Sequence, residues 1–346
     1  MSEFEGGRGG GWGVAPEQVP VLAATGMRKH FTASRGVRSM VGARRVVHAV
    51  DDASVVLAPG EIVAVVGESG SGKTTLGRLM SRLELPTAGK LQLNGEDVPR
   101  GGARSLRAFR RRVQVVFQDP YASLNSAHKV GHHLERPLLL HKIARSDAQA
   151  RELAIDLLDR VGLSPGAQFI DRYPQQLSGG QRQRVAIARA LATGPQAIIA
   201  DEPVASLDVS SRLAILNLFA SIARDGASLL YITHDIASAR YFADRIIVMY
   251  AGEIIEQGPA EDVVSQPLHP YTRLLIDSAP DPDRRHEGRR SAERAGEIAS
   301  LITPPSGCRF HPRCPHAMPR CSEQAPPEFT PDPLRRVACW LHGEQP

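Results

Sequence analysis

Short apolar runs alternate with helical patterns along much of the chain. Residues 61–66 form one such run, and their β-branched and apolar side chains predict a buried strand. A helix is expected soon afterwards, because apolar residues recur at the i, i+3, i+4, i+7 spacing at Leu76, Leu79, Met80 and Leu83. The longest apolar runs have the length of strands, and none approaches the about 18–20 residues needed to cross a bilayer. The pattern therefore predicts a globular chain of strands and helices, whose role at any membrane would depend on a partner.

The loop between this strand and this helix carries a specific motif. Residues 67–74 fit G-x-x-x-x-G-K-[ST], and the loop consists of Gly67, Glu68, Ser69, Gly70, Ser71, Gly72, Lys73, Thr74 and Thr75. Such glycines let backbone N–H groups wrap nucleotide phosphates, and the start of the helix adds favourable partial charge. Lys73 would bridge the phosphates and the Thr74 hydroxyl would ligate Mg²⁺. A dinucleotide-binding loop does not continue with Gly-Lys-Thr. The motif therefore predicts a nucleoside triphosphate site.

An acidic pair follows a second apolar strand, residues 197–200. Asp201 ends that strand, where its carboxylate can hold Mg²⁺ through water, and Glu202 stands beside it as a candidate base for the attacking water. An isolated Asp-Glu pair at a strand end is commonly just an exposed acidic pair. Together with the phosphate loop, this pair indicates hydrolysis of the bound nucleotide.

A third motif points to one class of NTPase, and its residues are Leu177, Ser178, Gly179, Gly180 and Gln181. Ser178 with Gln181 three positions later matches a capping box, so a helix should begin here and present a second anion-binding end. The phosphates of one nucleotide cannot contact both helix starts of a single compact protein without a special geometry. The five residues resemble the signature of ATP-binding-cassette (ABC) ATPases, in which two cassettes sandwich ATP head to tail. The resemblance implies that this signature closes on the phosphate loop of a partner cassette.

Further elements of that family are present in the expected order. Phe31 resembles the aromatic residue that stacks on adenine, with a core or loop phenylalanine as the alternative. Gln118, after the strand 113–117, resembles the glutamine that contacts Mg²⁺ and water and touches the membrane subunit. His234 resembles the switch histidine that contacts the γ-phosphate. Another stretch, Ser206, Leu207 and Asp208, resembles the loop that crosses the dimer interface.

The resemblance implies a complete ATPase with ATP and Mg²⁺ as ligands. Its catalytic residues would be Glu202, His234 and Gln118, and the metal would be held by Thr74, Gln118 and Asp201.

The chain also indicates a branch of the family. Between Lys73 and Leu177 there is no heptad run of a DNA-repair cassette, and the sequence has neither a second phosphate loop nor fused membrane helices. Residues 117–125, 267–272 and 304–315 resemble the ATPase subunits of oligopeptide and dipeptide importers, in particular the second ATPase of the pair. The resemblance implies uptake of di- and oligopeptides. Oligosaccharide or nickel cargo, and a soluble ABC ATPase acting on nucleic acid or ribosomes, remain alternatives.

The same resemblance implies the partners of the chain. They are a second ABC ATPase, two transmembrane permease subunits and an extracytoplasmic substrate-binding protein, with this subunit at the cytoplasmic face of the cell membrane. A homodimer is the alternative to the heterodimer. No nucleic acid is expected, because the net charge of +5 is modest for 346 residues and lacks the dense basic stripe of a nucleic-acid binder.

All four cysteines lie in the last 39 residues, at Cys308, Cys314, Cys321 and Cys339. A chain expected in the cytosol is not expected to pair them as disulfides. Without a C-x₂-C motif, the spacing favours neither zinc nor an iron–sulfur cluster, and four thiolates suit both. The resemblance to the peptide-importer ATPases favours a [4Fe–4S] cluster, with zinc and metal-free buried thiols as alternatives.

The expected fold is α/β. The resemblance implies a RecA-like P-loop ATPase core with an antiparallel β subdomain at about residues 21–98, a helical subdomain at about 104–190 and a cysteine-containing C-terminal tail. We expect residues 1–17 to be a disordered leader, because they are rich in glycine and lack the apolar core of a signal peptide. Residues 18–260 would form the nucleotide-binding domain, and residues 261–346 the C-terminal region of oligopeptide importers.

Overall fold

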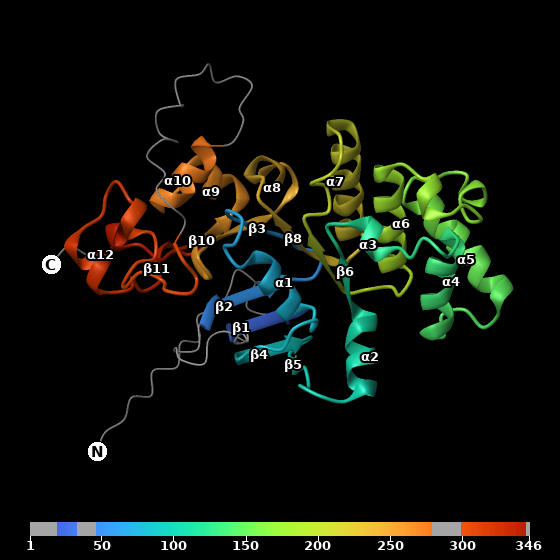
Figure 1. The fold of residues 1–346 in the computed structure, drawn as a ribbon, viewed down its shortest axis with the longest axis horizontal. Helices are drawn as coiled ribbons and strands as arrows, with labels where there is room; N and C mark the ends of the chain where they lie inside the picture. Colours follow the sequence, from blue (N-terminus) through green and yellow to red (C-terminus); the bar gives the residue numbers. More distant parts are fainter. Residues whose placement is uncertain (1–18, 33–45, 279–298, 344–346) are drawn as a thin grey trace, which may run out of the picture.

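The computed structural model describes residues 19–32, 46–278 and 299–343. The expected leader, residues 1–17, lies outside the described residues. The described chain forms two β-sheets with helices around them, and Figure 1 shows the elements in chain order from blue to red.

The larger sheet has eight strands in the order β11-β12-β10-β9-β3-β8-β7-β6. Five neighbouring strands run parallel, β9 (Arg245–Tyr250), β3 (Ile62–Val66), β8 (Ser228–Thr233), β7 (Ala197–Asp201) and β6 (Val113–Val116). Every residue of β3 and β8 is buried, as expected for parallel strands covered on both faces. The predicted α/β core and the strand before the phosphate loop are therefore confirmed.

The smaller sheet is antiparallel and has the order β2-β1-β4-β5. Its strands are β2 (Val46–Leu57), β1 (Leu22–Thr32), β4 (Ala88–Leu93) and β5 (Glu96–Asp97). Helix α1 (Lys73–Met80) contacts strands of both sheets, and its buried Leu76, Leu79 and Met80 share one apolar cluster with both. The expected β subdomain is therefore interrupted, because β3 and α1 fall within residues 21–98 but belong to the larger sheet and its cover.

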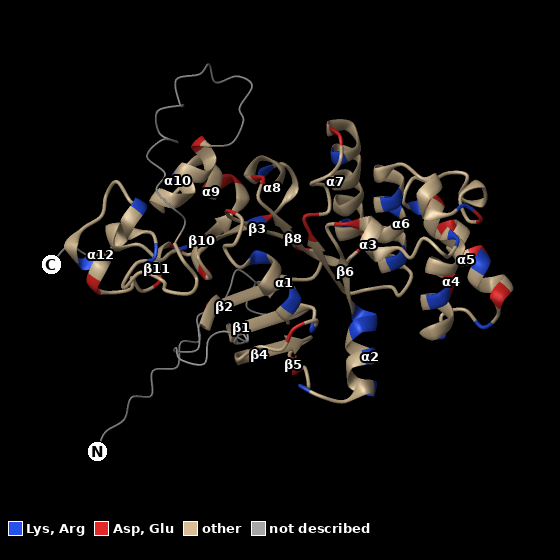
Figure 2. Cartoon of the chain, in the orientation of Figure 1, with Lys and Arg blue, Asp and Glu red and all other residues tan. Residues whose placement is uncertain are grey.

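Helices α4 (Val130–Leu140), α5 (Asp147–Arg160) and α6 (Gly179–Leu191) pack together at one end of the molecule, green in Figure 1. Helix α2 (Ala103–Arg112) and the single turn α3 (Pro120–Ser123) precede them. Figure 2 shows α2 as a basic element, with Arg110, Arg111 and Arg112 in its last turn. Strand β6 lies within the expected helical range but pairs with β7 of the larger sheet.

Helices α7 (Val209–Arg224) and α8 (Ile236–Phe242) connect the parallel strands. After β10 (Glu253–Pro259) the chain forms α9 (Ala260–Ser265) and α10 (Pro270–Asp277). None of the helices in the described ranges is long and apolar enough to span a membrane.

The C-terminal tail, residues 299–343, lies at the opposite end from α4–α6 (Figure 1). It contains α12 (Pro319–Glu323), β11 (Phe329–Asp332) and β12 (Arg335–Val337). Strand β12 pairs antiparallel with β10, and Arg335 forms a buried ion pair with Glu256 at 3.0 Å. Phe310 is only 2% exposed and belongs to the main core. The tail therefore completes the larger sheet, a feature that its proline-rich sequence did not indicate.

Candidate active site

The phosphate loop follows β3 and leads directly into α1, so the predicted strand–loop–helix order is confirmed. Gly67 and Gly72 have φ angles of +155° and +101°. A Cβ on Gly67 would lie 2.2 Å from the Met249 carbonyl oxygen, and one on Gly72 would lie 2.3 Å from that of Ala49. Only glycine fits at these two positions. Because no side chain caps α1 at Gly72, the helix start keeps its N–H groups available to an anion.

Lys73 is buried at the centre of this loop. Its Nζ donates to the carbonyl oxygens of Gly67 and Glu68, each at 2.8 Å. Burial lowers the pKa of Lys73, whereas the charges of Glu202, Asp201 and Glu68 act in the opposite direction. The ammonium group is thus held where it can meet phosphate oxygens.

Two of the three predicted magnesium ligands, Thr74 and Asp201, meet across 127 residues of sequence. The Thr74 hydroxyl donates to Oδ1 of Asp201 at 3.1 Å, from the start of α1 to the end of β7. Burial raises the pKa of Asp201, and the neighbouring Glu202 acts in the same direction, while the Thr74 hydrogen bond opposes the shift. A divalent cation would relieve this concentration of negative charge.

Two of the predicted catalytic residues, Gln118 and His234, contact the carboxylate of the third, Glu202. Nε2 of Gln118 donates to Oε2 of Glu202 at 3.0 Å, and Nδ1 of His234 lies 3.2 Å from Oε1 of Glu202. Glu202 has a φ of +44°, an uncommon backbone conformation for a residue other than glycine that is often found at functional sites. The site therefore contains a base candidate with a polar partner on each oxygen.

The signature residues lie elsewhere, at the start of α6. The Ser178 hydroxyl accepts from the N–H of Gln181 at 3.2 Å, and the Gln181 side chain accepts from the N–H of Ser178 at 2.9 Å. The predicted capping box is thereby confirmed. Gly180 lies beside Ser211 of α7, and no hydrogen bond in the described part of the chain joins residues 177–181 to residues 67–75. The chain does not bring its own signature onto its own phosphate loop.

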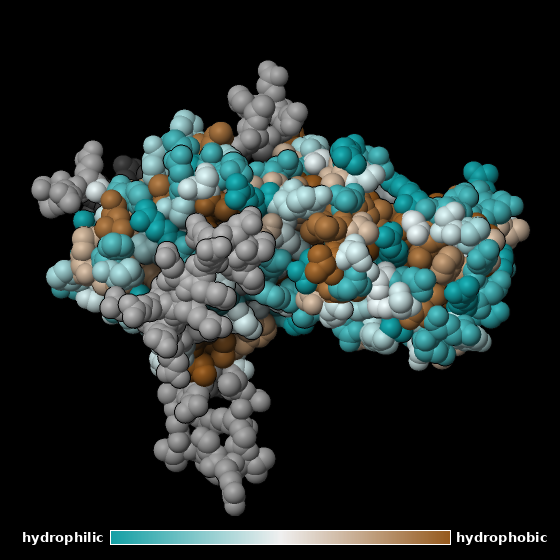
Figure 3. All heavy atoms as spheres, turned by 90° about the horizontal axis from the view of Figure 1, so that it is seen from above, coloured by the Kyte–Doolittle hydropathy of each residue, from teal (hydrophilic) through white to brown (hydrophobic). Residues whose placement is uncertain are grey.

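The predicted interface loop leads into α7. Asp208 caps this helix by accepting from the N–H of Ser211 at 2.9 Å, and hydrogen bonds from Ser210 and Ser211 lower the pKa of Asp208. Ser206 and Leu207 precede it. Val209 and Leu213, in the first turns of α7, are 72% and 43% exposed. Figure 3 shows apolar surface in the part of the molecule where α7 lies.

Phe31 is at the end of β1, 38% exposed, with the Lys29 ammonium 4.8 Å from its ring centroid. Its exposure argues against an ordinary core position. Stacking of this ring on adenine stays a prediction.

The four cysteines of the tail are free thiols, and three of them are close enough to Cys308 to act on it electrostatically. The N–H of Cys308 donates to the carbonyl oxygen of Cys321 at 2.8 Å. Burial raises the pKa of Cys308 to about 11, and the thiols of Cys339, Cys321 and Cys314 act in the same direction. Burial likewise raises the pKa of Cys339 to about 11 and that of Cys314.

The sequence did not indicate two residues that contact the phosphate loop from the C-terminal side. Arg313 forms an ion pair with Glu68, and the Tyr271 hydroxyl accepts a hydrogen bond from the N–H of Glu68. Tyr271 lies in a stretch noted only for its resemblance to peptide importers. No local pattern marks Arg313.

Comparisons with known proteins agree with this geometry. Residues 50–205 match the family described as ABC transporter, and residues 255–321 match the one described as oligopeptide/dipeptide transporter, C-terminal region. A probable peptide ABC transporter ATP-binding protein of Sinorhizobium fredii is 46% identical over 299 residues, which is 86% of this chain and 84% of that protein. The dipeptide transport ATP-binding protein DppF of Escherichia coli is 41% identical over 312 residues, covering 89% of this chain and 91% of the relative.

Among solved structures, a dimeric ATP-binding cassette in a post-hydrolysis state, bound to ADP and phosphate, superposes with a TM-score of 0.60. It is 29% identical, and the match covers 69% of this chain and 98% of that one. The cbiO1 subunit of an ABC transporter complex from Clostridium perfringens superposes with the same TM-score at 25% identity, over 72% of this chain and 92% of that one.

Proposed function

The chain belongs to the family of ATP-binding subunits of oligopeptide and dipeptide ABC transporters, and from this we propose that it hydrolyses ATP to drive the uptake of di- and oligopeptides. The observation that carries the proposal is the convergence of Gln118 and His234 on Glu202, beside the Lys73–Thr74–Asp201 group. The relatives named above supply the cargo class.

In this proposal the residues of the site divide the tasks of phosphate binding, metal binding and proton transfer. The loop residues Gly67–Thr75 bind the phosphates through backbone N–H groups, with Lys73 providing the positive charge. Glu202 accepts a proton from the attacking water at Oε1 or Oε2, while Gln118 orients that water and His234 contacts the γ-phosphate. Thr74, Asp201 and Gln118 would hold Mg²⁺, which offsets phosphate charge when bound. Phe31 stacks on adenine.

We propose that a second cassette completes the site. Its signature would cover the ATP of this chain, while Ser178, Gly179 and Gly180 would cover the ATP of the partner. The exposed Ser178 before α6 and the exposed Val209 and Leu213 next to Asp208 support a pairing surface there. We propose a heterodimer.

The remaining partners follow from the family and from the surface around Gln118. Phe117 and Tyr121, on either side of it, are 40% and 62% exposed, which suits a docking surface for a membrane subunit. We propose two transmembrane permease subunits, an extracytoplasmic substrate-binding protein and a location of this chain at the cytoplasmic face of the membrane.

We also propose that Cys308, Cys314, Cys321 and Cys339 hold a [4Fe–4S] cluster, which when bound would cross-link the tail. With raised pKa values the thiols of Cys308 and Cys339 stay protonated at neutral pH unless a metal takes the place of the protons. A tetrahedral zinc with Zn–S bonds of ~2.3 Å needs sulfurs within about 3.8 Å of one another. Across the described chain no three cysteine sulfurs lie within 4.8 Å of each other, a wider spacing than such a zinc site has.

Purification of the chain from detergent-solubilised native membranes tests the transport proposal. We expect two multi-span subunits, a second cassette and a binding protein that carries peptide, all identified by mass spectrometry. A bound sugar or nickel would overturn the peptide cargo alone. Recovery only in the soluble fraction, with ribosomes or nucleic acid, would overturn the transport function.

A further inference from the structure

The C-terminal tail contacts the phosphate loop through a two-point ion pair. Nη1 of Arg313 lies 2.8 Å from Oε2 of Glu68, and Nη2 lies 3.0 Å from Oε1. The Arg313 side chain is only 4% exposed and the Glu68 side chain 27%. Parallel bonds of this kind are among the strong and geometrically specific contacts of arginine.

Tyr271 holds the backbone of the same loop residue. Its hydroxyl accepts from the N–H of Glu68 at 2.8 Å, and its buried ring lies 4.6 Å from that of Tyr250 and 5.5 Å from that of Phe310, centroid to centroid. The N–H of Tyr271 donates to Nδ1 of His269, whose pKa is lowered to about 3 by burial, so that the imidazole is neutral and can accept. Glu68 is thus held at both its carboxylate and its amide.

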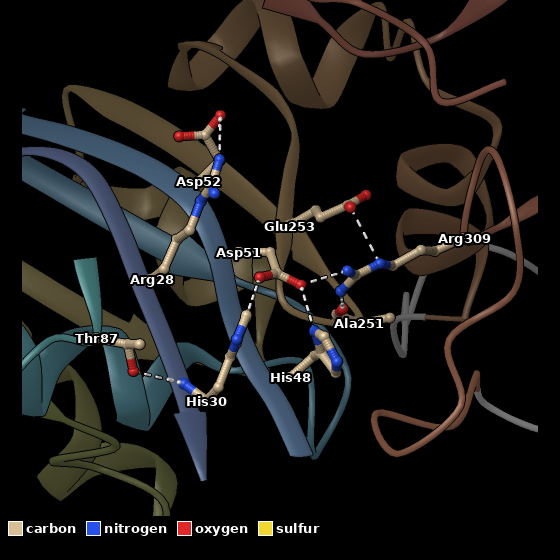
Figure 4. A network of polar contacts seen from close by, with 9 residues as sticks. All are labelled: Arg28, His30, His48, Asp51, Asp52, Thr87, Ala251, Glu253 and Arg309. Atoms are coloured by element: carbon tan, nitrogen blue, oxygen red, sulfur yellow. Dashed lines mark hydrogen bonds and ion pairs between the residues drawn. The ribbon is translucent and has the colours of Figure 1, made fainter. Parts of the chain in front are cut away.

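A second arginine fixes the platform from which Arg313 extends. Figure 4 shows Arg309 directed at Asp51 of β2, at Glu253 of β10 and at the carbonyl oxygen of Ala251. Its Nε lies 3.0 Å from Glu253, and its side chain is 10% exposed. Residues 308–314 are therefore tied to both sheets, which limits the freedom of Arg313.

The negative charge of Glu68 gives its ion pair with Arg313 a role in the phosphate loop. Glu68 follows the first glycine of the phosphate loop and is close enough to Lys73 to act on it electrostatically. Unneutralised, its carboxylate would repel the phosphates and compete with them for the Lys73 ammonium. The guanidinium of Arg313 cancels that charge and points both carboxylate oxygens toward the tail.

We propose that Arg313 is a positioning residue of the ATP site, which neutralises Glu68 and thereby lets the C-terminal tail set the affinity for ATP. The proposal rests on the proposed function only in that residues 67–75 bind ATP. Arg313 touches no substrate and acts through the loop.

The test uses the full-length protein under reducing conditions, with ATP affinity measured by calorimetry. We expect Arg313→Gln to raise the Kd for ATP about tenfold and Arg313→Lys to give an intermediate value, since lysine keeps the charge but loses the fork. Adding Glu68→Gln to Arg313→Gln should restore the Kd to within about threefold of the wild type, because the repelling charge is gone. Arg320→Gln, a change at the arginine whose guanidinium carbon lies 3.5 Å from the Trp340 ring centroid in the same tail, is the matched control and should leave the Kd unchanged.

A further readout separates positioning from general damage. In steady-state hydrolysis Arg313→Gln should raise KM with little change in kcat, because binding and not proton transfer is affected. A wild-type Kd for Arg313→Gln would overturn the proposal, and so would a double variant at least as weak as Arg313→Gln alone. Failure of the wild-type chain to bind ATP would instead overturn the proposed function.

Discussion

Glu202 is the residue that the other polar side chains of the predicted catalytic group contact. Both of its oxygens have partners, Gln118 and His234, and its backbone N–H donates to the carbonyl oxygen of Ile232 at 2.9 Å. The residue is thus fixed from β7 and β8 together, which would pre-orient its carboxylate for the proposed role as base.

Glu202→Gln tests this assignment. The amide keeps the shape of the side chain but cannot accept the proton, so we expect hydrolysis to fall by about 10²–10⁴-fold while ATP binding is retained. Steady-state phosphate release and calorimetry provide the two measurements. Glu261→Gln, at an exposed glutamate paired with Arg240 at 2.7 Å, is the control, and an equal loss there would contradict the role of Glu202.

Asp51 should make stability depend on pH. Burial acts to raise the pKa of Asp51. Hydrogen bonds from His30 and Arg309 outweigh this effect and lower the pKa from 3.8 to about 2. A carboxyl with a lowered pKa in the folded state adds stability above its unfolded pKa, and this is lost as the pH falls toward the folded value.

We therefore expect Asp51→Asn to lower the free energy of unfolding by on the order of 2 kcal/mol near neutral pH. The difference from the wild type should shrink as the pH falls from about 5 toward 2, as denaturant titrations at several pH values would reveal. A difference independent of pH would mean that the Arg309–Asp51 contact has no electrostatic role.

At the scale of elements, the start of α6 combines a helix cap with the predicted signature residues. Ser178 caps the helix, and the partly exposed Gly179 and Gly180 follow it in the predicted signature. Helix stability and the signature surface should consequently respond together to changes at this position.

Ser178→Ala should lower the free energy of unfolding by about 1 kcal/mol, because the N–H of Gln181 loses its acceptor. Ser178→Thr keeps a hydroxyl and should cost less. Denaturant unfolding of the two variants provides the comparison, and a threonine variant as unstable as the alanine variant would show that capping is not the cause.

Elements with local signals were predictable from the sequence, and contacts between distant segments were not. The loop 67–75 and the cap at Ser178 depend on residues within a few positions of each other, so their chemistry appears in the residue pattern. Arg313 and Glu68 are 245 residues apart, and no periodicity links them. Strands β11 and β12 have four and three residues, too few for an alternating pattern.

Thr74 and Asp201 form an intermediate case. They are 127 residues apart, yet each lies at the end of an element that the sequence marks clearly, Thr74 in the first turn of α1 and Asp201 at the end of β7. Because parallel strands bring their carboxyl ends to one edge, two local motifs sufficed to place a site there.

At the scale of the whole molecule, the tail and the phosphate loop form one connected unit. The proposed cluster on the four thiols of the tail can be tested by elemental analysis. We expect the purified full chain to hold about four irons, and Cys308→Ser to lose iron together with acid-labile sulfide. Elemental analysis checks both, with Ser306→Ala as the control. Zinc at one per chain, or no metal in anaerobically purified protein, would contradict the cluster.

The pairing of β12 with β10 has a consequence for how the tail can be studied. Removing the tail would uncover the edge of β10 at Glu256 and Gln257, where β12 pairs with it, in a strand whose residues 255–258 are buried. A bare strand edge of this kind recruits other chains, so truncated protein should aggregate. Insolubility after deletion would therefore report the loss of an edge cover and not the loss of a cofactor or of ATP binding. Single substitutions that keep β11 and β12 in place are the way to separate these effects.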